Sequence, residues 1–374
     1  MKKQIQLLSL KTLRQRTGMT QKDLAGKLQV SFQTVSKWEN GIALPDITYL
    51  PGLAEIFDVS IDVLLGIKPL ESDKCWRQFD GSEYWHQNME RTKQWKSLFW
   101  NDDYFAFLVR NVWRIHTPVN ILDFGCGYGF LGMKLLPLLP DGSTYTGIDM
   151  DGEAIDSAER LFRNIKGTAE FIRENVYQYE PKKTYDIVIS LYLLSYLKEP
   201  EIVLEKMKSS LAAKGKLIVM DGSLEMEQAG YYSDIETKEG LRRPDYTPVW
   251  ENEKKHGERD YRMGLKLPGL LKSIGLTSVQ ARISDRVILY DAEEKPENKA
   301  FRYVHKHKDS TKEGLSYYQA RGIRYPEAMR YVEYAEKTGR YLDSEDAFAV
   351  STSGLYFVWG ELPEDRMKGD NDDV

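Results

Sequence analysis

The chain has 374 residues, a formal net charge of −5 and two cysteines. This length suggests two or three domains, and Cys75 and Cys126 are too few for a disulfide framework or a zinc site, so no metal is expected. Because the sequence carries neither a secretory leader nor an apolar run of about 18 residues, it predicts a cytoplasmic protein that does not enter a membrane.

Residues 1–68 carry the signals of short amphipathic helices around a tight turn. Thr20 is placed to cap one helix and Ser31 to cap the next, whose inner face would be Val35 and Trp38. Together with the W-E-N-G that follows and the D-V-S-I-D-V-L-L-G ending, this pattern resembles the Cro/lambda-repressor type of helix-turn-helix domain. The resemblance implies a small all-α domain that binds double-stranded DNA.

The resemblance also implies roles for individual residues. The second helix of such a domain lies in the major groove, where Gln pairs with adenine, Lys with guanine, and Phe packs on a thymine methyl. Base contacts are assigned to Phe32, Gln33 and Lys37, and phosphate contacts to Gln21, Ser31 and Asn40. Arg14 and Glu39 match a structural ion pair of the family. The alternative is that Gln33 and Lys37 lie on an ordinary solvated helix face and do not contact DNA.

Charge separates this domain from the rest of the chain. Residues 1–68 hold nine Lys and Arg against six Asp and Glu, a net charge of +3, which leaves −8 for residues 69–374. Because the first domain is basic and the rest of the chain is acidic, nucleic acid is expected to bind only to the first domain. Because +3 is a small charge, we expect a homodimer that reads an inverted-repeat operator with half-sites about 34 Å apart.

Residues 69–100 begin as a turn-rich connector and continue as an aromatic segment at near-helical spacing. The pattern predicts a helix that packs on the following domain. Tyr84, Trp85 and His86 are expected to pack there and to cover a ligand site as well.

The strongest signal is the run V-N-I-L-D-F-G-C-G-Y-G at 119–129. A buried strand ends in Asp123, and glycines follow at alternate positions, where the missing Cβ atoms let the main chain lie against a ligand. Asp149 ends the next apolar strand, at the distance from which a carboxylate binds both hydroxyls of a ribose. The sequence therefore predicts a ribose-bearing cofactor.

Two cofactors fit this pattern. Residues 127–132 match G-x-G-x-x-G, the dinucleotide fingerprint, which is a weak signal alone. Asp123 argues against a dinucleotide, because an acid there would repel a pyrophosphate but attract the cationic amino group of a methionine moiety. An acid before G-x-G-x-G resembles the first motif of class I S-adenosylmethionine (SAM) methyltransferases.

This second resemblance implies SAM as the cofactor. Asp123 would lie near the methionine moiety, Asp149 would bind the ribose, and Met150 would flank the adenine. Asn175 falls where the family contacts the adenine amino group, usually with Asp. The residues assigned to the cofactor are Asp123, Gly125, Gly127, Gly129, Asp149, Met150, Asn175 and Leu191.

The later segments keep the order of this family and predict a multidomain protein. The methyltransferase domain would be a Rossmann-like α/β domain whose seven-stranded, mostly parallel sheet is covered by helices on both faces. It would span residues 101–362, with insertions at 229–261 and 292–347 and a polar tail at 363–374. Residues 169–176 are a predicted strand and turn, 185–197 a predicted apolar strand followed by the entry to a helix, and 214–223 the next predicted strand. A terminal hairpin of 277–290 with 354–362 is also predicted, and 261–276 is a predicted helix that Gly275 stops.

The sequence favours a small molecule as the methyl acceptor. The segment after the fourth strand reads S-L-Y-L-L-S-Y-L, where amino-directed DNA methyltransferases carry N/D-P-P-Y/F, and no cysteine follows a proline, as cytosine-C5 chemistry requires. The 229–261 insertion is long enough to be a lid, and its His256 is a candidate general base. The alternative is that His256 is a solvated surface residue. The 292–347 insertion is expected to form helices that cap the pocket or contact a second copy.

Two functions stay open at this point. In the first, a small-molecule methyltransferase is fused to a sequence-specific DNA-binding domain that regulates transcription. In the second, the methyltransferase-like domain is catalytically silent and senses SAM or a metabolite for a one-component regulator. The cofactor residues would be intact in both functions, so the two are distinguished by whether the protein catalyses methyl transfer.

Overall fold

The structure is a computed structural model, and it describes residues 10–57, 59, 61–64, 92–163, 165, 167–257, 259–293, 295–305 and 312–364. The chain divides into two compact units. The first combines Met1–Gln78, Ile235–Asn252 and His305–Tyr341, and the second combines Phe79–Asp234, Glu253–Val304 and Leu342–Val374. No helix in the described part of the chain is both long and apolar enough to cross a membrane.

The N-terminal domain is helical, as the sequence predicts. Thr20 begins its second helix with a reciprocal capping box to Asp23, and the Ser31 side chain caps the third by accepting from the Thr34 amide. Val35 is fully buried and Trp38 nearly so, which confirms the predicted inner face. The helices are α1 (Leu10–Arg16), α2 (Gln21–Leu28), α3 (Phe32–Glu39), η1 (Ile47–Tyr49), α4 (Leu50–Phe57) and α5 (Ile61–Leu64).

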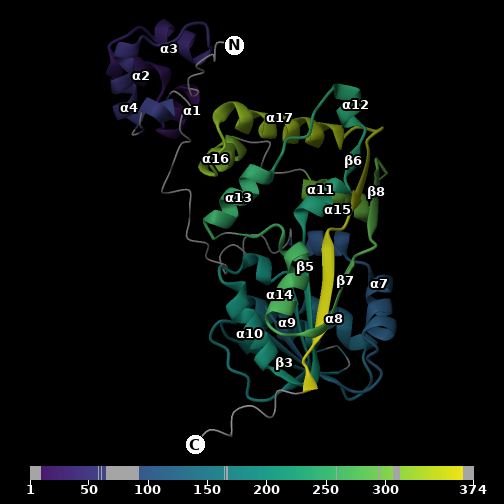
Figure 1. The fold of residues 1–374 in the computed structure, drawn as a ribbon. Coiled ribbons are helices and arrows are strands. Elements are labelled where there is room, and N and C mark those ends of the chain that lie inside the picture. The colour runs from purple at the N-terminus through teal and green to yellow at the C-terminus, as the bar shows by residue number, and fades with distance from the viewer. Residues whose placement is uncertain are drawn as a thin grey trace, which may run out of the picture. The chain divides into compact units, whose positions relative to one another are not determined.

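The second unit is built on a seven-stranded sheet with the order β3-β2-β1-β4-β5-β10-β7. In Figure 1 this sheet lies where β3, β5 and β7 are labelled, with α8, α9, α10 and α14 labelled around it. The strands are β1 (Asn120–Phe124), β2 (Thr144–Asp149), β3 (Thr168–Arg173), β4 (Tyr185–Leu191), β5 (Leu211–Gly222), β7 (Thr277–Ile283) and β10 (Leu355–Glu361). The first five are parallel, and β10 pairs antiparallel with both β5 and β7. This arrangement confirms the predicted fold class. The order reverses between β1 and β4, and in open α/β sheets ligands bind beyond the carboxyl ends of the strands at such a point.

Helices cover both faces of this sheet because successive strand residues point to opposite sides. Ile187 and Ile218 face one apolar layer, and their neighbours Val188 and Val219 face the other. The first layer contains α7 (Asp102–Phe107), the π-helix η2 (Leu108–Val112), α8 (Phe130–Leu135), η3 (Leu136–Leu138) and the end of α9 (Gly152–Phe162). The second contains η4 (Leu194–Tyr196), α10 (Pro200–Ser209) and α14 (Met263–Ser273).

The predicted strand 277–290 is wrong in one respect, because it is two strands. β7 ends at Ile283, and the chain crosses polar residues 284–286 before β8 (Val287–Asp291). β8 pairs with β9 (Phe348–Thr352), which also pairs with β6 (Tyr232–Ser233) in a separate three-stranded sheet. Gly354 marks the same break on the returning chain, since a Cβ there would lie 2.2 Å from the Ser223 carbonyl oxygen.

The two insertions fold mainly as helices, as expected for 292–347. They contribute α12 (Ile235–Glu239), α13 (Thr247–Lys255), α15 (Pro296–His305), α16 (Lys312–Ala320) and α17 (Tyr325–Tyr341), and α11 (Leu224–Ala229) ends where the first insertion begins. In the first unit, the Tyr331 ring on α17 packs against Tyr246 of the 235–252 segment at 4.9 Å and against Tyr318 of α16 at 4.6 Å. Tyr325 packs against the core of the helix-turn-helix domain.

Candidate cofactor site and DNA-binding surface

Asp149, at the end of β2, is tied to the glycine-rich turn after β1. The Gly127 amide donates to Asp149 Oδ2 at 2.8 Å, and the Asp151 amide donates to Oδ1 at 3.0 Å. Gly127 has a φ of 53°, and a Cβ on it would meet no atom within 4 Å. The turn therefore presents main chain to open space beside a carboxylate, which is what binding a ribose-bearing ligand requires.

Asp123, at the end of β1, is 1% exposed. The Tyr145 hydroxyl donates to its Oδ2 at 2.5 Å, while its buried Oδ1 has no hydrogen-bond partner among the described residues. Burial raises the pKa of Asp123 to about 7, although the Tyr145 hydrogen bond and the Lys96 ammonium act in the opposite direction. A buried carboxylate oxygen without a partner is costly, so the site fits a donor or a cation supplied by a ligand.

Lys96 is the third charged group of this site, and our sequence reasoning missed it. It lies on the helical segment 92–99, with its ammonium 5.4 Å from the ring centre of Tyr128 and 5.5 Å from that of Phe130. Burial lowers the pKa of Lys96 to about 8, and the nearby carboxylates of Asp123 and Asp149 limit that decrease. The expected packing of aromatic side chains holds for this segment, but Tyr84, Trp85 and His86 lie outside the described residues.

The other residues assigned to the cofactor differ in accessibility. Met150 is 50% exposed directly after β2, whereas Leu191 is 5% exposed and belongs to the apolar core of the sheet. Asn175 Oδ1 accepts a hydrogen bond from the Tyr177 amide at 2.9 Å, and its second lone pair is the one that an adenine amino group would use. Gly125 and Gly129 both have positive φ angles in the turn.

A second cluster lies at the carboxyl ends of β4 and β5. Tyr192 directly follows β4 with a φ of 54°, an uncommon conformation for a non-glycine residue, and its buried hydroxyl has no partner among the described residues. Its ring packs edge-on against Trp95 at 5.0 Å and closely over Gly222. Asp221, at the end of β5, is fully buried and accepts from the Ser195 amide at 3.0 Å.

Arg259 adds a cation to this cluster. Its guanidinium stacks between the rings of Tyr196, at 4.5 Å, and Tyr261, at 4.7 Å. Burial raises the pKa of Asp221 to about 6, while the Ser195 amide and the Arg259 charge limit the increase. His256, the base candidate from the sequence, instead lies exposed just after α13.

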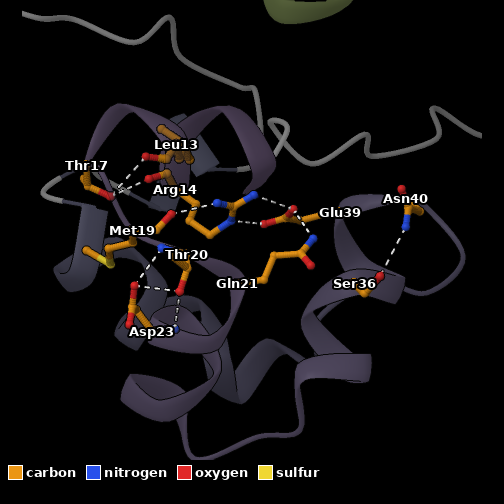
Figure 2. Close-up of polar contacts among 10 residues, drawn as sticks. All are labelled: Leu13, Arg14, Thr17, Met19, Thr20, Gln21, Asp23, Ser36, Glu39 and Asn40. Carbon is orange, nitrogen blue, oxygen red and sulfur yellow. Dashed lines mark hydrogen bonds and ion pairs between the residues drawn. The ribbon is translucent and has the colours of Figure 1, made fainter.

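In the helix-turn-helix domain, Arg14 and Glu39 form the predicted ion pair (Figure 2). Arg14 Nε lies 2.6 Å from Glu39 Oε1, and Nη2 donates to Oε2 at 3.0 Å. Gln21 Nε2 donates to the same Oε2 at 2.7 Å, so this proposed phosphate contact is also part of the scaffold. Arg14 Nη1 donates to the Met19 carbonyl at 2.7 Å, which joins the end of α1 to the start of α2 and the end of α3.

The remaining DNA-binding candidates lie on or beside α3 with exposed side chains: Ser31, Phe32, Gln33, Lys37 and Asn40. Phe32 is 44% exposed although it is apolar. Ser31 Oγ accepts from the Thr34 amide at 3.1 Å, and Asn40 Nδ2 donates to Ser36 Oγ at 3.3 Å. Gln33 and Lys37 are thus presented on one exposed helix, as base reading requires.

The described part of the chain thus combines a small helical domain with an open α/β domain that carries a glycine-rich turn between its first strand and α8. A family model described as a methyltransferase domain matches residues 122–217, and a helix-turn-helix model matches residues 10–64. The chain therefore joins a helix-turn-helix domain to a methyltransferase domain.

Similar proteins cover only parts of the chain. A probable cobalt-precorrin-6B C(15)-methyltransferase (decarboxylating) from Thermoplasma acidophilum is 29% identical over 77 residues, which are 20% of this chain and 38% of that protein. The ribosomal protein L11 methyltransferase of Stenotrophomonas maltophilia is 31% identical, and the match covers 32% of this chain and 40% of that protein. The chain thus spans about two fifths of these curated relatives. A Haemonchus contortus phosphoethanolamine N-methyltransferase 2 solved with SAM has a TM-score of 0.41 at 13% identity, over 72% of this chain and 56% of that one.

Proposed function

We propose that this protein is a SAM-dependent methyltransferase that acts on a small molecule and is joined to a DNA reader that regulates transcription. The observation that carries the proposal is the pair of carboxylates at the glycine-rich turn. Asp123 has a buried oxygen without a partner among the described residues, and Asp149 anchors the Gly127 amide. An acid for a ligand amino group and a second acid for ribose hydroxyls match SAM and not a pyrophosphate-bearing dinucleotide.

The roles of the residues follow from their places at the strand ends. SAM, when bound, supplies an electrophilic methyl group on a sulfonium. Asp149 accepts from the ribose hydroxyls, Asp123 accepts from the methionine amino group, and the glycine turn makes room for both. Because the reaction is an in-line displacement, the protein mainly orients an acceptor beside the cofactor.

We place the acceptor at the carboxyl ends of β4 and β5. Tyr192 offers a buried hydroxyl that can hold an acceptor atom, and burial keeps its pKa well above the ordinary value, so it acts as a neutral donor. Asp221, with a pKa of about 6, is ionised at neutral pH and is better placed than the exposed His256 to take a proton from a hydroxyl or amine.

Product detection tests the proposed activity. Purified protein incubated with labelled SAM and a cell extract is expected to transfer label to a small organic product, and Asp221→Asn is expected to reduce that transfer without reducing SAM binding. Binding of SAM without any labelled product would instead favour the sensor, in which the domain reports on SAM or a metabolite.

We further propose that the protein binds an inverted-repeat operator as a homodimer. The exposed face of α3 supports base reading, and the small net charge of residues 1–68 supports the use of two copies. Replacing Gln33 by Ala is expected to cost about 1–3 kcal/mol and to relax specificity at one base step. Asn40→Ala, which removes the proposed phosphate contact, should weaken binding to all sequences alike. Selection from a random DNA pool checks both, and enrichment of no motif by the wild-type protein would contradict DNA reading.

Coupling between the ligand and the operator is the regulatory part of the proposal. The unit that holds the helix-turn-helix domain also holds parts of both insertions, so the chain passes between the units at 78/79, 234/235, 252/253, 304/305 and 341/342. A domain on a single linker would be connected once, and multiple connections give ligand-induced changes more routes to the DNA reader.

Operator titrations with no ligand, with SAM, and with SAM plus the acceptor test this coupling. We expect operator affinity to shift about 5- to 150-fold, and operator DNA to shift ligand affinity by the same factor, as linkage requires. Three superimposable curves on a verified operator would mean that the methyltransferase domain does not control the DNA reader.

A further inference from the structure

We propose that Lys96 binds the carboxylate of the methionine moiety of SAM, opposite Asp123, so that the two residues together recognise an α-amino acid zwitterion. This inference rests on the proposed binding of SAM. It assigns a function to the aromatic segment that precedes the first strand. From the sequence alone, only the aromatic rings of this segment were expected to reach the site.

The position of Lys96 is set by the side chains next to it on the same helix. Trp95 packs edge-on against Tyr192 at 5.0 Å, and Phe99, one turn later, is 1% exposed. These apolar anchors hold the helix against the sheet. The Lys96 ammonium consequently lies over Tyr128 and Phe130, the residues on either side of Gly129, where the turn passes into α8.

The charges around Lys96 define what the site accepts. Three groups that are or can become anionic act on the ammonium, namely Asp123, Asp149 and the thiol of Cys126. Asp149 is held by the Gly127 and Asp151 amides and Cys126 is buried, which leaves Asp123 as the acid that acts on the ammonium and has an unused oxygen.

A zwitterion inserted between Asp123 and Lys96 satisfies both charges at once. Its ammonium meets the unpartnered Oδ1, and its carboxylate meets the lysine, in hydrogen bonds that are stronger than neutral ones. A cation without a carboxylate would instead add a positive charge next to Lys96. The arrangement therefore selects for the carboxylate group of the ligand.

Calorimetry on the full chain with SAM and with decarboxylated SAM tests the assignment. The wild-type protein is expected to prefer SAM, and Lys96→Met should bind SAM about 10- to 100-fold more weakly while its affinity for decarboxylated SAM does not fall. Lys96→Arg should restore the preference, because it keeps the charge.

Lys93→Met is the matched control. Lys93 lies on the same helix with its ammonium 5.3 Å from the Tyr128 ring centre, but it is not among the groups that act on Asp123. This variant should keep the wild-type preference.

The outcomes separate this inference from the proposed function. The role of Lys96 would be overturned if Lys96→Met preferred SAM over decarboxylated SAM as strongly as wild type does. It would also be overturned if Lys96→Met bound SAM more tightly than wild type, because the lysine would then be competing with the ligand for Asp123. Failure of the folded wild-type protein to bind SAM at all would overturn the proposed function itself.

Discussion

Protein carrying Asp149→Ala is expected to bind SAM about 10- to 150-fold more weakly than wild type, a loss of about 1.5–3 kcal/mol. The substitution removes a charged acceptor for two ribose hydroxyls. It also frees the Gly127 amide, which donates to Asp149 Oδ2 at 2.8 Å, so the turn loses the contact that positions it. Isothermal titration with SAM and S-adenosylhomocysteine measures the change.

Asp151→Ala provides the matched control two residues away. Asp151 caps α9 by accepting from the Glu153 and Ala154 amides, so its loss should lower stability by about 1 kcal/mol without removing a ribose acceptor. Its backbone amide, which donates to Asp149, remains in this variant. Wild-type affinity in Asp149→Ala, measured beside this control, would contradict the ribose assignment.

The second large effect is expected from Glu39→Ala, which should destabilise the helix-turn-helix domain by about 3–5 kcal/mol and abolish operator binding. The Glu39 side chain is 0% exposed and that of Arg14 is 10% exposed, so the substitution leaves a largely buried guanidinium without its counter-charge. The expected loss is a large share of the stability of a small domain. Limited proteolysis of the full chain, with mapping of cuts in residues 10–64, reports the unfolding of this domain separately.

A double substitution of Arg14 and Glu39 by Met separates charge from packing. Since exchanging a buried ion pair for apolar side chains is often neutral, the double variant should recover much of the stability that Glu39→Ala loses. Protection of the domain in Glu39→Ala equal to wild type would show that the pair is not structural.

The Arg14–Glu39 pair also predicts how the stability of the helix-turn-helix domain changes as the pH falls. Burial would raise the pKa of Glu39, but hydrogen bonds from Arg14 and Gln21 outweigh it and hold the pKa below its usual 4.5. A lowered pKa in the folded state contributes stability above the unfolded value, and this contribution is lost as the pH falls through the folded pKa. The domain should therefore keep this contribution above pH 4.5.

The features that the sequence predicted well are those fixed by neighbouring residues. The caps at Thr20 and Ser31 depend on donors three residues away, and the nearly continuous burial of β4 follows from its apolar run. The positions of Asp123 and Asp149 follow from strands that end at the same edge of one sheet.

The features that the sequence did not reveal depend on residues that are distant along the chain. Lys96 is one lysine in an aromatic helix, and only tertiary packing brings it to carboxylates more than twenty residues later. Tyr145 occupies an apolar strand as any core tyrosine would, and its bond to Asp123 requires the pairing of β1 with β2. The division of 277–290 between two sheets was hidden because both halves have strand periodicity.

The β8–β9 pair also fixes where the 292–347 insertion begins and ends. Asp291 and Phe348 are direct partners in the β8–β9 pair, so the insertion leaves and re-enters the fold at adjacent points. A two-residue Asn-Gly turn can join two strands at such a separation. The path of the chain through either sheet therefore does not depend on the insertion, whose residues 305–341 belong to the first unit, where Tyr325 packs on the core of the helix-turn-helix domain.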